Sequence, residues 1–465
     1  MRPRAWEGML FAGRASTWRD AEGGRSGMDV PARRAAWGSV RAAPAAGRIT
    51  SSFAVGGRAL GRPGWRLAVL GLLFALMAAV LPPAARAQES VPTAPIVIEG
   101  VQLRQVLEAA APLYVTPRVS DEKMRWMRDA IAVALDEVPR ITGLPLPQSR
   151  LEFYLFDDPG ELRSLSGQIL RSPGPRVSPE CFALAMTGTP RRGIYCQADG
   201  WDSAAEALDY VAHELTHQVQ QGDSAARRGL AQWFNEGLAE YVQNQVTAKH
   251  APGYAARDRW QREARVASAL HNDRLLRLRD LATNQRWQQA AGSGWAGLIY
   301  SESSLVIKWL ADTYGLPAVV DVVRQTGAPL GFDAAFQEAF GTSVDGAERA
   351  ARTALEADLL TRYPVGLSAF ESEGPAGAVF YYAVVGFQPQ VSLEKDYRDE
   401  SGATAAEGPN PRARAEAQRT DRSGFATWSW ASAPDAVGVA PRTVQLTVRG
   451  SDGSEASGST LLTPR

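Results

Sequence analysis

Two of the four histidines of this chain stand four residues apart, with a glutamate directly after the first. The stretch reads HELTH and contains His213, Glu214 and His217. On a helix, residues i and i+4 lie on the same face, so both imidazoles can direct a nitrogen at one metal ion about 2 Å away. Glu214 stands one position round the helix, where it can take a proton from water. The pattern predicts a zinc-binding helix; the competing interpretation is an amphipathic helix whose histidines and glutamate are solvated.

A third ligand is required, because catalytic zinc sites combine three protein ligands with a water. Eighteen residues separate His217 from Glu236, which lies in WFNEGLAEY on the next predicted helix. Two helices joined by a turn can bring this carboxylate back beside the histidines. Glu240 follows one helical turn later. Its carboxylate can accept the remaining N–H of a liganding histidine; the alternative is a plain surface glutamate.

The HELTH stretch, the 18-residue gap and NEGLAEY together resemble the gluzincin zinc metallopeptidases, and most closely their exported peptidase MA-like relatives. The resemblance covers roughly residues 120–360. It implies an α+β, zincin-like catalytic domain with a small mixed sheet and active-site helices. It also implies one Zn²⁺ held by His213, His217 and Glu236, with Glu214 as the general base.

The same resemblance assigns further roles. Glu240 and Asn235 are expected to contact the ligands rather than the metal, and so to hold the ligands in orientation. Tyr300 stands where the aminopeptidase branch has a tyrosine that opens a helix and stabilises the tetrahedral intermediate; the alternative is a packing residue. A metzincin would need a histidine where Asp223 stands. The aminopeptidase element Gly-x-Met-Glu-Asn is absent, which favours an endopeptidase.

The function expected from these residues is an exported, zinc-dependent metallopeptidase that hydrolyses peptide bonds. One alternative is a catalytically silent zinc-binding protein whose C-terminal module mediates binding. Another is a zinc hydrolase of a non-peptide amide. A structural zinc normally has four protein ligands and needs no base, so the retained Glu214 favours the enzyme. The sequence leaves the substrate and the oligomeric state open.

An export signal is predicted near the N-terminus. Arg62 and Arg66 precede an uncharged run from Leu67 to Leu81, and the run ends in Ala-Arg-Ala at residues 85–87. Fifteen apolar residues are short for a membrane span, which needs about 20. We therefore expect a cleaved signal peptide and a secreted, periplasmic or cell-surface protein without a stable membrane span; a signal-anchored protein is the alternative.

The charge distribution excludes one class of partner. Residues 1–87 contain 13 arginines and 4 acidic residues, although the whole chain has 50 of each sign. The remainder therefore carries an excess of 9 negative charges. A nucleic-acid binder needs a basic surface, so we expect no nucleic-acid partner. The partner expected from the metallopeptidase resemblance is a peptide or protein substrate.

Two cysteines, Cys181 and Cys196, lie in the part of the chain expected to be exported. Disulfides persist in such compartments, so a bridge is favoured over two separate buried thiols. Residues 191–199, RRGIYCQAD, read as a strand that could pair with an extended peptide, and the bridge would brace that strand.

Hydrophobic patterns suggest the remaining elements. We expect helices at 120–143 and 203–222, a helical stretch at 101–110, a strand at 150–158, and a hairpin turning at 451–453. The C-terminal part is rich in aromatic residues and valine, which is typical of a β-sandwich. The predicted organisation is a leader of uncertain translation (1–64), a signal peptide (65–87), a linker or pro-segment (88–120), the metallopeptidase domain (121–363), and a β-rich module (365–465) with a disordered insert at about 398–423.

Overall fold

The computed structural model describes a large part of the chain after residue 95. The described residues are 96–98, 100–106, 109–148, 151–162, 181–184, 193–199, 201–222, 229–326, 330–371, 373–375, 378–403, 419–431 and 441–463. All of them belong to one compact unit. The predicted leader and signal peptide lie outside the described residues, as does most of the predicted insert, 404–418.

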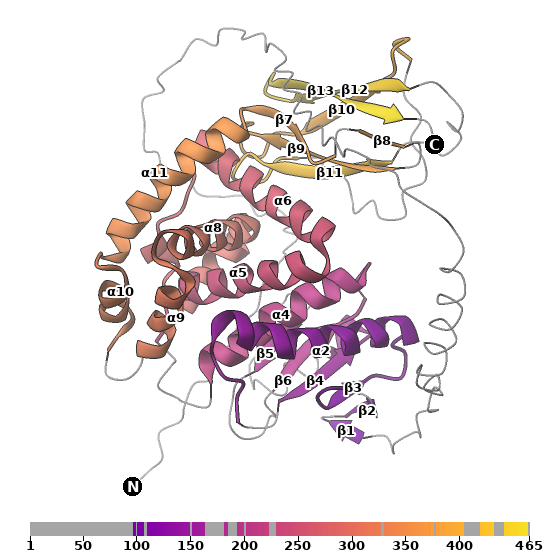
Figure 1. Ribbon diagram of the computed structural model, residues 1–465. Helices are drawn as coiled ribbons and strands as arrows, with labels where there is room; N and C mark the ends of the chain where they lie inside the picture. The colour runs from indigo at the N-terminus through magenta and orange to yellow at the C-terminus, as the bar shows by residue number, and fades with distance from the viewer. Residues whose placement is uncertain are drawn as a thin grey trace, which may run out of the picture. The chain divides into compact units, whose positions relative to one another are not determined.

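The fold is α+β, as expected from the sequence (Figure 1). It begins with a six-stranded sheet in the order β1-β2-β3-β4-β6-β5. Strands β3, β4 and β6 are parallel, and the other pairs are antiparallel, so the sheet is mixed. The strands are β1 Ile96–Ile98, β2 Val101–Val106, β3 Leu113–Val115, β4 Glu152–Phe156, β5 Cys181–Leu184 and β6 Gly193–Gln197.

One predicted element is wrong. Residues 101–110 were expected to include a helix, but Val101–Val106 form β2, which pairs with β1 on one side and β3 on the other. Short apolar runs fit helix and strand patterns equally well. Here the tertiary pairing decides, and it buries Leu103, which is 1% exposed. Part of the predicted linker therefore belongs to the sheet.

The disulfide between Cys181 and Cys196 is confirmed. The two cysteines face each other directly in the register of β5 and β6. Strand β6 is also paired with β4 on its other side. It therefore has no free edge, and the expectation that residues 191–199 receive an extended peptide is wrong. Among the described strands, β5 is the edge at this end of the sheet.

Helices form the central part of the unit. The first two, α2 and α4, pack against each other, and α4 also lies against β5 and β6. Both begin at serine caps: Ser120 accepts a hydrogen bond from Lys123 N, and Ser203 accepts one from Glu206 N. The helices are α2 Asp121–Thr142, α4 Ala204–Gln221, α5 Gln232–His250, α6 Pro252–His271, α7 Asn284–Ala290, α8 Ala296–Tyr314, α9 Leu316–Gln325, α10 Phe332–Phe340 and α11 Val344–Arg362. Two short turns, η2 Leu278–Leu281 and η3 Ala291–Trp295, complete the set.

The C-terminal module consists of two sheets, in the orders β10-β12-β13-β8 and β11-β9-β7. Aromatic and aliphatic residues from β9, β11, β12 and β13 form one core between them, so the expected β-rich, sandwich-like module is confirmed. The predicted hairpin joins β12 to β13, with Gly453 at φ +87° in its turn. The strands are β7 Gly366–Ala369, β8 Glu373–Pro375, β9 Val379–Val385, β10 Leu393–Arg398, β11 Ala426–Ala431, β12 Arg442–Gly450 and β13 Glu455–Thr463.

The module and the helices share a hydrophobic core. Ala383, Val385 and Phe425 of the module belong to the same buried cluster as residues of α6, α8 and α11. Hydrogen bonds add to this contact: Trp260 Nε1 donates to Ser368 Oγ (3.0 Å), and Gly386 N donates to Ser268 Oγ (2.9 Å). The module is therefore packed on the helices through apolar and polar contacts.

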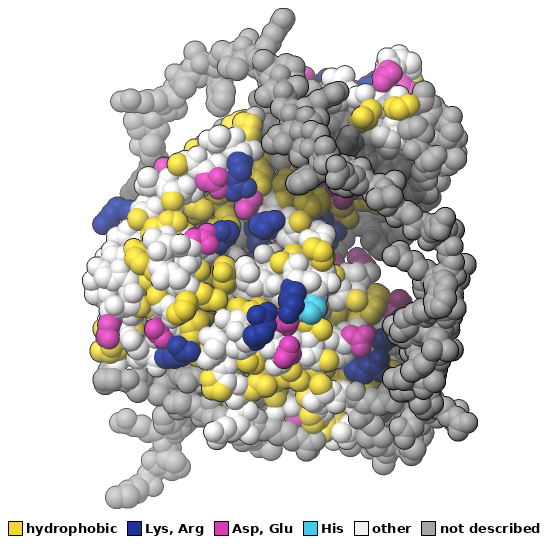
Figure 2. Space-filling view, in the orientation of Figure 1, with side chains coloured by type: hydrophobic (Ala, Val, Ile, Leu, Met, Phe, Trp, Pro, Cys, Tyr) yellow, Lys and Arg dark blue, Asp and Glu magenta, His cyan; other side chains and the backbone are white. Residues whose placement is uncertain are grey.

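Two findings concern the expected partners and the expected lack of a membrane span. On the face in Figure 2, the coloured basic and acidic side chains are interspersed in small groups, and no extended basic area is seen among the described residues. Of the helices in the described part of the chain, none combines the length and apolar character needed to cross a membrane.

Candidate metal centre

The first two candidate ligands lie on α4. The Ser203 cap is reinforced by Glu206, whose Oε2 accepts a hydrogen bond from Asp202 N (2.6 Å). At the other end, Gly222 has φ +52° and its N–H bonds to the Gln218 carbonyl, which ends the helix. Between these ends α4 is buried from residue 211 to 220, polar side chains included. Its histidine face therefore points into the protein rather than into water.

The third candidate ligand, Glu236, lies in the second turn of α5, which packs against α4 and α8. The glycine of NEGLAEY explains the close approach of α5 to α8. A Cβ on Gly237 would lie 2.6 Å from the carbonyl oxygen of Ser303 on α8, a distance that only glycine avoids. This close packing fixes the position of Glu236 relative to α8.

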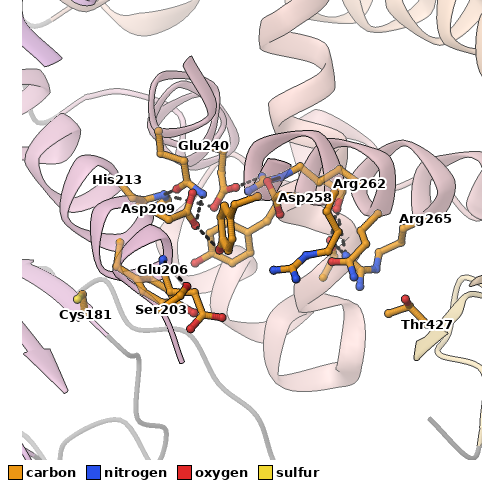
Figure 3. Close-up of a pocket in the computed structure, with 18 of the residues that line it drawn as sticks. Cys181, Ser203, Glu206, Asp209, His213, Glu240, Asp258, Arg262, Arg265 and Thr427 are labelled. Atoms are coloured by element: carbon orange, nitrogen blue, oxygen red, sulfur yellow. Dashed lines mark hydrogen bonds and ion pairs between the residues drawn. The ribbon is translucent and has the colours of Figure 1, made fainter. Parts of the chain in front are cut away.

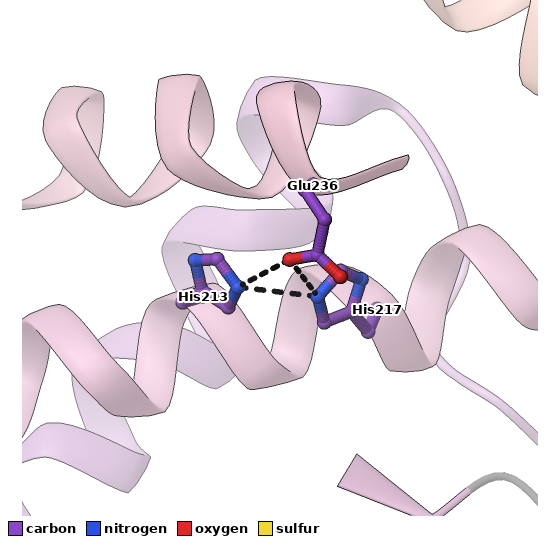
Figure 4. Close-up of side chains that lie close together, drawn as sticks. All are labelled: His213, His217 and Glu236. Atoms are coloured by element: carbon purple, nitrogen blue, oxygen red, sulfur yellow. Dashed lines mark hydrogen bonds and ion pairs between the residues drawn. The ribbon is translucent and has the colours of Figure 1, made fainter. Parts of the chain in front are cut away.

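His213, His217 and Glu236 converge on one point, as Figure 4 shows. The two Nε2 atoms are 3.1 Å apart, and Glu236 Oε2 lies 3.3 Å from each of them. Tetrahedral ligands at the zinc distance of about 2.0–2.1 Å are separated by about 3.3–3.4 Å. The three donor atoms thus have the spacing of one face of a tetrahedral metal site. This group, found among the described residues, could hold a metal ion.

Each of the three candidate ligands contacts a glutamine. Gln243 Oε1 lies 2.7 Å from His213 Nδ1, and Gln220 Oε1 lies 2.9 Å from His217 Nδ1. An amide oxygen only accepts hydrogen bonds, so each Nδ1 carries the proton and each Nε2 keeps a lone pair. Gln232 Nε2 donates to Glu236 Oε1 (2.7 Å), which leaves Oε2 directed at the histidines.

The glutamines are held in turn by other buried groups. Gln243 Nε2 donates to Asp209 Oδ2 (2.9 Å), and burial raises the pKa of Asp209 to about 6. Gln220 Nε2 donates to the main-chain carbonyl of Asn235 (2.9 Å). Such chains orient the ligating side chains, and their loss commonly weakens metal binding.

The electrostatics of the group favour a cation. Burial opposes ionisation of Glu236, but the two nearby histidines outweigh it and lower the pKa of its carboxyl to about 2. Burial also opposes protonation of His213, but the carboxylates of Glu236 and Glu214 outweigh it and raise the pKa of the imidazole. The group therefore stabilises positive charge, either as a proton on an imidazole or as a metal cation between the three donor atoms.

Glu214 and Tyr300 line the same cleft as the three candidate ligands. The Tyr300 ring lies 6.3 Å from the His213 ring and 5.0 Å from the Trp287 ring, between centroids. The resemblance predicts that Tyr300 begins its helix. This prediction is wrong, because α8 begins one turn earlier, at Ala296. Burial raises the pKa of its phenol well above the usual value, so the hydroxyl stays a hydrogen-bond donor at neutral pH.

The two expected supporting residues act differently from each other. Glu240 Oε1 lies 3.3 Å from His213 Nδ1, farther than Gln243, and the carboxylate also pairs with Arg262. Glu240 is therefore shared between the histidine and an arginine. Asn235 contributes through its main-chain carbonyl, whereas its side-chain Nδ2 has no hydrogen-bond partner among the described residues.

The candidate metal centre lines a cleft of about 590 Å³, in which Figure 3 labels His213. The cleft continues along α6, where Arg262 and Arg265 are found, to Thr427 on β11. Side chains of β9 and β11 thus form part of its wall. No sequence pattern indicates this wall, because its residues lie more than 160 positions after the histidines.

The three glutamines were also missed from sequence. A weak signal exists: Gln220 follows His217 by three residues, and Gln232 precedes Glu236 by four, which are helical neighbour spacings. Glutamine is common on helix surfaces, so this spacing alone carries little information. The hydrogen bonds in the folded structure show that they contact the ligands.

Comparisons with known proteins add no functional assignment. No family model matches this chain, and no curated protein matches it. Among solved structures, the chain is similar to a functionally unknown conserved protein from Bacillus anthracis str. Ames. The sequence identity is 9%, the match covers 76% of this chain and 71% of that chain, and the TM-score is 0.26. A likeness this distant carries no argument, so the function is inferred from the site itself.

Proposed function

We propose that this protein is a zinc-dependent metallopeptidase of the gluzincin, peptidase MA-like type. The observation that supports this most is the convergence of His213, His217 and Glu236 at 3.1–3.3 Å, with Glu214 lining the same cleft. Two imidazoles and one carboxylate form the ligand set of thermolysin-type catalytic zinc. Three protein ligands leave one position for water or substrate, which a structural four-ligand site lacks.

Zinc held by these residues would supply Lewis acidity, polarising a scissile carbonyl and acidifying water. Glu214 is the base in this proposal. It follows the first ligand directly on α4 and reaches the cleft, where its carboxylate would accept a proton from the attacking water and return it to the leaving amine. A silent zinc protein would have no use for a carboxylate in this position.

Tyr300 is proposed to stabilise the oxyanion. Its hydroxyl remains protonated at neutral pH. Tyr300 belongs to α8, which packs closely against α5 at Gly237. A phenol placed there would donate a hydrogen bond to the tetrahedral intermediate, where the negative charge develops.

The peptide is proposed to bind beside β5. Among the described strands, β5 is the edge strand of the sheet next to α4. Its first residue, Cys181, lines the cleft. An extended peptide can add to such an edge through main-chain hydrogen bonds. The Cys181–Cys196 disulfide ties this edge to the interior strand β6.

We further propose that the protein acts outside the cytoplasm. The sequence before residue 88 has the pattern of a signal peptide. The disulfide supports this location, because such bonds persist in oxidising compartments.

The test is to measure zinc content and casein cleavage for the full-length protein and for Glu214→Gln. We expect about one zinc per chain in both, and cleavage by the variant reduced by about 10²–10⁴-fold, the usual contribution of a general base. Glu206→Gln is the matched control: it removes a carboxylate from the same helix and the same cleft, and its amide oxygen can still accept from Asp202 N.

Three outcomes would contradict the proposal. Equal cleavage by both proteins, with zinc bound, would exclude Glu214 as the base. Zinc binding without cleavage by either protein would favour the silent zinc-binding alternative. A protein that cleaves only small non-peptide amides would indicate the third possibility, an amidase.

A further inference from the structure

One arginine in the cleft differs from the other two. Arg262 bonds to Asp258 Oδ2 (2.6 Å) and pairs with Glu240, and Arg265 lies 3.6 Å from Asp421 Oδ2. Arg257, on the same helix α6, forms no ion pair with any carboxylate in the described part of the chain. A guanidinium has five N–H donors and is always charged, so an arginine without a carboxylate partner has unused capacity.

Arg257 is held in place by aromatic side chains. Its guanidinium carbon lies 5.1 Å from the centre of the Tyr254 ring and 4.8 Å from that of the Tyr381 ring. Its Nη1 donates a hydrogen bond to the Tyr381 hydroxyl (2.8 Å). Cation–π contacts with two rings hold the guanidinium without neutralising it.

The nearby acidic groups are already engaged. Asp258 and Glu240 pair with Arg262, and Asp209 accepts hydrogen bonds from Gln243 (2.9 Å) and Tyr254 (3.3 Å). Arg257 therefore offers positive charge beside three carboxylates that contact other side chains. All of these side chains line the same cleft as His213.

We propose that Arg257, between Tyr254 and Tyr381, is a specificity-determining subsite that binds a carboxylate of the peptide substrate. Planar bidentate pairing with a carboxylate is the interaction that a guanidinium makes best. Tyr381 belongs to β9, so the C-terminal module takes part in substrate selection by positioning this arginine. The inference rests on the proposed peptidase function, since it names the substrate class of the same cleft.

The test uses casein peptides in two forms: untreated, and methyl-esterified so that no carboxylate remains. We expect the wild-type protein to cleave the untreated peptides faster, on the order of tenfold to a hundredfold, as for a charge-assisted hydrogen bond. This ratio should fall to near one in Arg257→Gln, and Arg257→Lys and Tyr381→Phe should show intermediate ratios. Arg259→Gln, an exposed arginine two positions away on α6, should keep the wild-type ratio.

Synthetic peptides with amidated C-termini distinguish the two sources of a carboxylate. If the terminal carboxylate is bound, amidation alone removes the preference. If an acidic side chain is bound, amidated peptides with an internal glutamate keep it, and mapped cleavage sites show that glutamate at a fixed position. A wild-type ratio near one, or an undiminished ratio in Arg257→Gln, would overturn the inference.

A binding measurement separates this inference from the proposed function. The Glu214→Gln protein and the Glu214→Gln/Arg257→Gln protein are immobilised, and retention of untreated and esterified peptides is compared by mass spectrometry. An arginine-dependent preference in binding, with no cleavage by the wild-type protein, contradicts the peptidase and supports the subsite. Cleavage without any arginine-dependent preference supports the peptidase and contradicts the subsite.

Discussion

Two buried charge clusters lie along the same cleft, and they are balanced differently. In the arginine cluster, Arg262 contacts the carboxylates of Asp258 and Glu240. In the histidine cluster, Glu236 faces His213 and His217 and pairs with no arginine or lysine among the described residues. Buried charges are normally paired or bound to metals. In the arginine cluster, the protein supplies both the positive and the negative charges. The histidine cluster instead has the composition of a metal site.

The largest effect is expected from removing a ligand from the histidine cluster. Glu236→Ala leaves two imidazoles, which do not hold zinc in the manner of a three-ligand site. Bound zinc, measured by atomic emission after dialysis, should fall from about one equivalent to near zero. Glu240→Ala is the comparison, because it lies one turn away and should retain zinc. Equal zinc in Glu236→Ala and the wild type would show that the metal binds elsewhere.

Breaking the arginine cluster should affect stability instead. Arg262→Met leaves the carboxylates of Asp258 and Glu240 without their cation, and such a loss in a buried pair costs about 3–5 kcal/mol in the free energy of unfolding. Urea denaturation measures the change, and zinc content should be unaltered. Arg259→Met, at an exposed position on the same helix, should change stability by less than about 0.5 kcal/mol. Loss of zinc from Arg262→Met would show that the clusters are not independent.

A smaller effect is expected from a residue that holds a ligand in place. Gln243→Leu removes the acceptor closest to His213 Nδ1, so the ring loses its fixed orientation. Changes of this kind weaken metal binding by about 10–100-fold, which competition with a chelator can measure. Gln245→Leu, two positions along α5 and exposed, is the control. An unchanged zinc affinity in Gln243→Leu would mean that Glu240 suffices as the acceptor.

The smallest effect concerns a balanced cluster outside the cleft. Hydrogen bonds from Lys249 and Arg140 lower the pKa of the Glu137 carboxyl to about 2. Because the folded-state pKa is depressed, its stabilisation is present above about pH 4.5 and is lost as pH falls towards 2. Glu137→Gln should therefore flatten the acid side of the stability curve, with little change in zinc content. Asp136→Asn, exposed on the same helix, should leave that curve as it is.

Some of the fold could be predicted because local patterns and tertiary structure agree. The i, i+3, i+4 apolar stripe of α4 and its Ser203 cap lie within one segment, so periodicity and capping predict the helix. Strands β4 and β6 were predicted for the same reason. Strand β2 was not, because VQLRQV becomes a strand through pairing with β1 and β3 rather than through its own pattern.

The candidate site divides in the same way. The spacing of His213, Glu214 and His217 on one helix follows from helical geometry, so sequence alone determined that two imidazoles share a face and that a carboxylate lies beside them. The 18-residue gap to Glu236 limited the third ligand to the next helix.

Only the tertiary structure decided the rest. The separations of 3.1–3.3 Å between donor atoms depend on how α4 packs against α5, and Gly237 permits the close contact of α5 with α8. The placement of Arg257 against Tyr381 depends on a core shared with a module more than 100 residues later. Local sequence specifies periodicity and capping, whereas contacts between distant segments arise from burial of side chains that no local pattern pairs.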